Sequence, residues 1–176
     1  ATNSFITKQP TLHDRAGCSS YLSGDLFMSK PLILQRSDFA FFLPIQTRWA
    51  DNDMYGHVNN VTYYSYFDTA ANALLIEKTH FDAHHSPMIG LVVNSSCDFL
   101  QELSYPEIID VGVSIIKIGR SSLTYRLAIF KRHKDQAAAQ GQFVHVFVDH
   151  LNRQSVEIPD AMRQALQPYL GLELSA

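Results

Sequence analysis

One long helical segment followed by four segments of alternating apolar residues limits the fold of this chain more than any other feature. Over residues 60–78 the apolar side chains recur at helical spacing. From residue 90 onward the apolar period changes to two, which is the period of a strand. This order predicts an α+β fold in which one buried helix packs against an antiparallel sheet.

The individual elements follow from the same patterns. A run of aromatic and branched residues predicts a first strand over 39–49, and Pro44 places part of it at a sheet edge or bulge. The apolar face of the helix is formed by Tyr63, Phe67, Ala70, Ala71 and Leu74. Four strands are predicted over 91–103, 107–118, 121–132 and 137–150. The last of them is apolar on both faces, which predicts a central position, and Pro159 suits the start of a terminal helix.

The chain divides into an irregular N-terminal extension, 1–38, and one domain, 39–176. The extension has no sustained periodicity and is rich in serine, and 176 residues suffice for one domain with a core. Scattered lysines and arginines among the serines are typical of a targeting segment, whereas three aspartates, Asp14, Asp25 and Asp38, argue against one. We expect a cytoplasmic protein. If residues 1–38 follow a removed transit segment, the mitochondrial matrix or another organelle is the alternative.

Several function classes are disfavoured by composition. A net charge of -3 argues against a general nucleic-acid binder, and no apolar run reaches the length of a membrane span. Cys18 and Cys97 match no zinc or redox spacing, which favours a reducing compartment, although a disulfide between them stays open. His80 and His84 have a ligand-like spacing but lie in a predicted loop, so no metal and no cofactor is expected.

Chemically active side chains gather between the first strand and the helix, over residues 51–60. Asp53 and His57 are four residues apart, and Gly56 lets the loop turn so that both can face one pocket. A carboxylate and a histidine can together deprotonate a water, or the carboxylate can attack directly. Free N–H groups at Asn60 and Val61 can stabilise an oxyanion at the helix start. An alternative of similar weight is that Asp53 caps or braces the loop.

Other residues of this loop have simpler interpretations. We interpret Asp51 as a turn brace, and Asn59 or Asn60 as the helix cap. The chain has no Gly-x-Ser-x-Gly elbow, no phosphate loop and no dinucleotide fingerprint. A set of basic residues is expected near one end of the predicted hairpins, either binding phosphates or simply solvated: Lys117, Arg120, Lys131 and Arg132.

The segment 49–63, which contains Asp-Asn-Asp and then Gly-His-Val-Asn-Asn before a Tyr-rich helix, resembles the signature of hotdog-fold acyl thioesterases. The most similar group is the 4-hydroxybenzoyl-CoA thioesterase-like branch. The resemblance covers roughly 39–170, including the turn 119–122. It implies a long central helix wrapped by a curved antiparallel sheet of five or six strands. It also implies homodimers joined edge to edge, often paired into tetramers, with the active site between subunits.

The resemblance also implies roles for particular residues. Asp53 falls on the family's catalytic acid, which acts as general base or nucleophile on a thioester. His57 matches a histidine of the Gly-His-Val-Asn-Asn subgroup, and the backbone N–H near Asn60 lies where the thioester carbonyl is held. The expected substrate is an acyl-CoA, or an acyl carrier protein thioester. Substrate contacts are expected from Tyr55, Gly56, Val61, Tyr64, Arg120, Ser121 and Ser122.

Two positions depart from the family pattern. Several bacterial members carry a histidine seven residues after the catalytic acid, where this chain has Asn60, and the plant-like pattern has asparagine two residues after it, where this chain has Tyr55. Two alternatives therefore accompany the thioesterase hypothesis: a hotdog hydratase acting on an enoyl thioester, and a non-catalytic subunit that binds CoA esters.

Overall fold

The computed structural model describes residues 32–82 and 84–171. Five antiparallel strands form one sheet in the order β1-β3-β4-β5-β2. The strands are β1 (Phe41–Gln46), β2 (Met88–Phe99), β3 (Ile108–Ile118), β4 (Ser122–Lys131) and β5 (Ala139–Asp149). The helices are α1 (Asn60–Thr79) and α2 (Asp160–Leu166), with 3-10 turns η1 (Arg36–Asp38), η2 (Trp49–Asp51) and η3 (Gln167–Tyr169). The α+β prediction is confirmed, with every predicted strand present.

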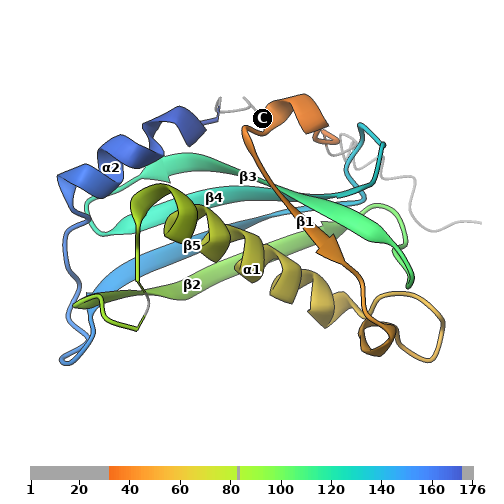
Figure 1. The fold of residues 1–176 in the computed structure, drawn as a ribbon, viewed down its shortest axis with the longest axis horizontal. Helices are drawn as coiled ribbons and strands as arrows, with labels where there is room; N and C mark the ends of the chain where they lie inside the picture. The colour runs from red at the N-terminus through yellow and green to blue at the C-terminus, as the bar shows by residue number, and fades with distance from the viewer. Residues whose placement is uncertain (1–31, 83, 172–176) are drawn as a thin grey trace, which may run out of the picture. The chain divides into compact units, whose positions relative to one another are not determined.

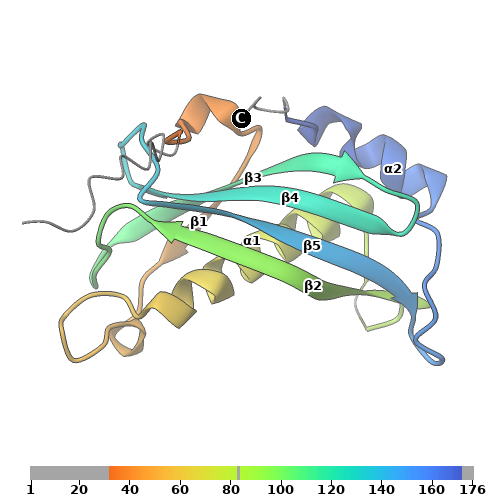
Figure 2. The ribbon, with the colours of Figure 1, turned by 180° about the vertical axis from the view of Figure 1, so that it is seen from behind.

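The helix α1 lies along one face of the sheet, as Figures 1 and 2 show from opposite sides. Its predicted apolar face is buried, and Phe67, Ala70 and Leu74 have no exposed surface. Removing a phenylalanine or leucine side chain from water contributes about 1.5–3 kcal/mol each. The small side chain of Ala70 lets the helix approach the strands closely. Packing against the sheet therefore holds the start of α1 in a fixed position.

The first strand ends earlier than predicted, at Gln46 rather than Trp49. The carboxylate of Asp51 accepts a hydrogen bond from the Arg48 backbone N–H, at 2.7 Å, and this contact closes the 3-10 turn η2. A local side-chain contact thus overrides the strand propensity of the aromatic run. Among the described strands, the one that contains Pro44 pairs with β3 alone, as expected for proline in a sheet.

The strand β2 forms the other edge of the sheet. It begins at Met88 and ends at Phe99, so it starts and ends earlier than the predicted 91–103. Its residues from Leu91 to Ser96 are exposed. β5 lies between β4 and β2, so it is interior as its pattern indicates, but the middle strand of the five is β4.

Part of the predicted extension contacts the domain. Leu34 is buried with Phe39 and Phe130, and Arg36 forms an ion pair with Asp110 at 2.9 Å. The rest of the extension, 1–31, lies outside the described residues. Among the described helices, none is both long and apolar enough to cross a membrane.

Candidate active site

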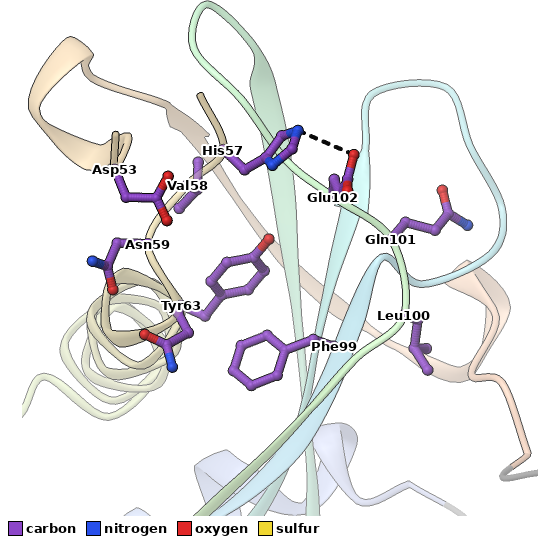
Figure 3. Close-up of a pocket in the computed structure, with 10 residues that line it drawn as sticks. Asp53, His57, Val58, Asn59, Tyr63, Phe99, Leu100, Gln101 and Glu102 are labelled. Atoms are coloured by element: carbon purple, nitrogen blue, oxygen red, sulfur yellow. Dashed lines mark ion pairs between the residues drawn. The ribbon is translucent and has the colours of Figure 1, made fainter. Parts of the chain in front are cut away.

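A pocket of about 750 Å³ opens where the start of α1 meets the segment that follows β2 (Figure 3). One wall is the loop between β1 and α1, and the other is the chain from Phe99 to Glu102. The pocket is lined by Asp53, His57, Val58, Asn59, Asn60, Tyr63, Phe99, Leu100, Gln101 and Glu102. The three residues predicted as catalytic, Asp53, His57 and Asn60, therefore lie around one space.

The loop is folded tightly by its own backbone. Asp53 donates its N–H to the carbonyl of His57 at 2.9 Å, and the N–H of Gly56 returns to the carbonyl of Asp53 at 3.1 Å. Gly56 has a φ of 87°, a conformation that side chains rarely adopt, so the glycine is required for this turn. The N–H of Tyr55 holds the Asp53 Oδ1 atom at 2.8 Å. This contact leaves Oδ2 of Asp53 without a protein partner among the described residues.

Asp51, two residues earlier, has a different environment. Its side chain is 2% exposed and accepts hydrogen bonds from the Arg48 guanidinium and, at 2.7 Å, from the Tyr66 hydroxyl. Burial alone would raise the pKa of Asp51, but these hydrogen bonds outweigh it and hold the pKa below its ordinary value. Burial and the same contact raise the pKa of Tyr66. Asp51 is therefore a structural brace that fixes the loop to α1.

The N–H groups in the first turn of α1 differ in whether another group accepts them. Asn59 caps the helix, because its Oδ1 atom accepts the N–H of Val61 at 3.1 Å. Thr62 donates its N–H to the carbonyl of Asn59 at 2.9 Å. The prediction that Val61 offers a free N–H is therefore wrong, since the cap occupies it. The N–H of Asn60 has no partner among the described residues, and Asn60 lines the pocket.

The opposite wall is tied to the loop by three contacts. Val58 donates its N–H to the carbonyl of Leu103 at 2.8 Å, and Tyr105 donates its N–H to Oδ1 of Asn52 at 3.1 Å. His57 Nε2 lies 3.1 Å from Oε2 of Glu102, the ion pair drawn in Figure 3. The loop and the segment after β2 are thus held together although they are far apart in the sequence.

The floor of the pocket is aromatic. The rings of Tyr63 and Phe99 meet edge to face with centroids 5.0 Å apart. Burial raises the pKa of Tyr63, so its hydroxyl stays neutral. A neutral aromatic floor beside a carboxylate and an open N–H suits a substrate with an apolar arm and a polar reactive group.

Asp53 also borders a second, smaller pocket of about 200 Å³, whose other lining residues are Trp49, Asn52, Met54 and Gly56. The indole of Trp49 is 81% exposed and meets Tyr105 edge to face at 5.9 Å. Within the described chain, Asp53 is common to both pockets.

None of the seven predicted substrate contacts is among the residues that line the main pocket. Gly56 lines the smaller pocket, Tyr55 and Val61 are exposed beside the loop, and Tyr64 stacks on Phe143 with centroids 6.3 Å apart. The turn that contains Arg120, Ser121 and Ser122 lies at the other end of the sheet, at the left of Figure 1, whereas the loop is at the right. There the carbonyl of Arg120 accepts hydrogen bonds from Ile158 and Arg163.

The expected cluster of basic side chains is also wrong within one chain. The strand register pairs Lys117 with Thr124 and Ile109 with Lys131, so the two lysines lie at opposite ends of the hairpin. A strand of this length spans roughly 30 Å. The basic residues all lie near hairpin ends in the sequence, but the length of the strands separates one end from the other.

No motif in the sequence indicated the end of β2 at Phe99 or the segment after it that contains Glu102. Their place in the pocket depends on the pairing of β2 with β5, which no local pattern encodes. Cys97, near this segment, is a weak nucleophile because burial and then the Asp98 charge raise its thiol pKa to about 12. Within the described ranges, no group of three or more His, Cys, Asp or Glu side chains could hold a metal ion.

Comparison with known proteins gives consistent results. Residues 47–166 match the family model described as the thioesterase-like superfamily. The crystal structure of the PA5185 protein from Pseudomonas aeruginosa is similar, with 45% identity, a TM-score of 0.78 and coverage of 80% of this chain and 98% of that one.

More distant proteins are also similar. A 1,4-dihydroxy-2-naphthoyl-CoA thioesterase from Synechocystis has 19% identity, a TM-score of 0.65 and coverage of 72% of this chain and 94% of that one, a likeness of fold. The uncharacterized protein YsmA of Bacillus subtilis is 28% identical over 98 residues, which cover 56% of this chain and 66% of that protein, just under two thirds of its length. These likenesses confirm the hotdog fold.

Proposed function

The chain belongs to the thioesterase-like superfamily, and we propose that it hydrolyses an acyl-CoA thioester to a free carboxylic acid and CoA. The observation that carries the proposal is that Asp53 and Asn60, whose N–H has no partner among the described residues, line one pocket of about 750 Å³. A thioester needs both groups, because one must supply or activate the nucleophile and the other must stabilise the carbonyl oxygen as it gains charge.

The proposed chemistry assigns a role to each of these groups. The carbonyl oxygen accepts a hydrogen bond from the Asn60 N–H, at the positive end of the α1 dipole. Asp53 either takes a proton from an attacking water or attacks the carbonyl carbon itself. Its Oδ1 atom is held by Tyr55, so Oδ2 is the atom that reacts. In both routes the C–S bond breaks and the thiolate of CoA leaves. In the direct route this step forms a mixed anhydride with Asp53, which water then hydrolyses to release the carboxylic acid.

We further propose that the working unit is a homodimer, or a dimer of dimers, joined through β2. This strand is an edge with unpaired backbone groups, and Leu91, Val92 and Val93 on it are at least 40% exposed. A second copy of the same edge would cover them. The turn that contains Arg120 could then contribute to the site only from a partner subunit, where its guanidinium would contact a CoA phosphate.

A panel of thioesters tests the proposed function. The purified protein is mixed with aliphatic and aromatic acyl-CoAs and with acyl carrier protein thioesters, and the released thiol is measured with a disulfide dye. We expect hydrolysis of at least one class of acyl-CoA. Loss of crotonyl-CoA absorbance without thiol release would instead identify a hydratase. Thermal stabilisation by CoA esters without turnover would identify a binding subunit.

A further inference from the structure

The main pocket contains a second carboxylate, Glu102, that no motif indicated. It follows β2, on the wall opposite Asp53, and its Oε2 atom lies 3.1 Å from Nε2 of His57. In Figure 3 the imidazole of His57 stands between the two acids, with Asp53 on one side and Glu102 on the other. This arrangement gives the two carboxylates different partners.

The approach of the Glu102 carboxylate to 3.1 Å favours one tautomer of the histidine. A carboxylate can only accept hydrogen bonds, so a proton on the Nε2 atom that faces it is favoured. In the neutral ring the other nitrogen, Nδ1, is then an acceptor. Figure 3 shows this second nitrogen turned toward the space between Asp53 and Tyr63. Within the pocket, three charged or titratable side chains face the imidazole: Asp53 from the loop, Glu102 from the segment after β2, and Tyr63 from α1.

We propose that Glu102 is a positioning residue, which holds the His57 ring so that Nδ1 accepts a hydrogen bond from the water that reacts beside Asp53. This inference rests on the proposed thioester hydrolysis, by the route in which Asp53 takes a proton from the attacking water. One hydrogen of the water is directed to Nδ1 and the other to the Asp53 carboxylate, which takes the proton. His57 gains no proton in this step, and its function is to orient the water.

The exposure of the pair makes the proposal testable. The side chains of His57 and Glu102 are 45% and 76% exposed, and exposed ion pairs contribute little to folding stability. A variant at Glu102 should therefore fold normally, so that a change in rate reports on position rather than on unfolding.

The first test measures the tautomer directly. The ¹⁵N chemical shifts of the His57 ring distinguish protonated from unprotonated nitrogens, and the His57→Asn variant assigns the signals among the eight histidines. We expect the wild-type ring, when neutral, to carry its proton on Nε2. Glu102→Ala should increase the population with a proton on Nδ1, whereas Glu102→Gln should shift it less, because the amide oxygen can still accept from Nε2. Unchanged shifts in Glu102→Ala would overturn the proposal.

The second test is kinetic and uses any thioester that the wild-type protein hydrolyses. Glu102→Ala should lower kcat about tenfold with little change in KM, the effect of about one misplaced hydrogen bond. Glu102→Gln should recover most of this loss. As a matched loss of one surface acid, Glu77→Ala on α1 should retain the wild-type rate. In the His57→Asn background, Glu102→Ala should have no further effect.

The outcomes separate this inference from the proposed function. Absence of thioester hydrolysis by the wild-type protein would remove the proposed function, and the shifts would still decide whether Glu102 sets the tautomer. If Glu102→Ala shifted the tautomer but left kcat unchanged, the contact between Glu102 and His57 would be structural only. This result would overturn the positioning role of Glu102. Independent, multiplicative losses from His57→Asn and Glu102→Ala would overturn it as well.

Discussion

The two aspartates of the loop should respond oppositely when each is replaced by alanine. Asp51 accepts four hydrogen bonds, three from Arg48 and one from Tyr66, with a side chain that is 2% exposed. The carboxylate of Asp53 accepts one hydrogen bond, from the exposed N–H of Tyr55. Asp51→Ala should therefore destabilise the fold, whereas Asp53→Ala should affect catalysis and leave the stability nearly unchanged.

The loss of stability in Asp51→Ala depends on whether each group that donates a hydrogen bond to Asp51 can find another acceptor. The Arg48 guanidinium is 69% exposed and can turn to water, so its loss contributes little. The Tyr66 hydroxyl is buried and would lose its acceptor, which costs about 1–3 kcal/mol, and the Arg48 N–H adds about 1 kcal/mol. For Asp51→Ala we expect the free energy of unfolding to fall by about 3 kcal/mol and Tm by roughly 6–12 °C. Asp53→Ala should stay within about 0.5 kcal/mol of wild type.

Urea unfolding followed by circular dichroism measures both variants. Tyr66→Phe serves as the matched control, because Asp51→Ala should cost less when the hydroxyl is already absent. The pH dependence has a fixed sign: the folded pKa of Asp51 lies below its ordinary 3.8, so its contribution is present above that value and is lost as the pH falls below it. Equal losses for the two aspartates, or a stable Asp51→Ala variant, would refute the assignment of brace and catalyst.

Three further outcomes are expected. His145 is buried without a hydrogen-bond partner in the part of the chain that the structure describes, and burial lowers its pKa below the ordinary 6.5. The free energy of unfolding should therefore fall as the pH drops through about 6.5, and His145→Phe should flatten this dependence in urea titrations. In Gly141→Ala a methyl group would overlap the backbone oxygen of Ser96, so β2 must shift and stability should fall by about 2 kcal/mol in the same assay. Val93→Asp should weaken the proposed dimer at least about tenfold in analytical ultracentrifugation, and an unchanged dimer would exclude β2 as the interface.

The sequence predicted those parts of the fold that local patterns encode. The helix that begins at Asn60 was predicted because its apolar residues repeat at helical spacing, and the cap at Asn59 because asparagine is a preferred capping residue. The strand ends were less accurate, because the contact between Asp51 and Arg48 ends β1 and no periodicity records it.

The pocket was only half predictable for the same reason. Asp53, His57 and Asn60 come from one short segment, so they could be named together from the motif. Glu102 joins them across a contact between segments 45 residues apart, and Val61 was misjudged because the side chain of Asn59 takes its N–H. Long-range pairing and side-chain caps decide such details, and composition does not report them.

The central claim is that Asp53 acts on a thioester held at the start of α1. Its most direct test compares CoA release by wild type and by Asp53→Asn, a variant of the same size that keeps an acceptor for the Tyr55 N–H. We predict that kcat falls by at least about 100-fold, the effect of removing a general base, while the midpoint of urea unfolding stays unchanged. A folded Asp53→Asn protein that releases CoA at the wild-type rate would contradict the account.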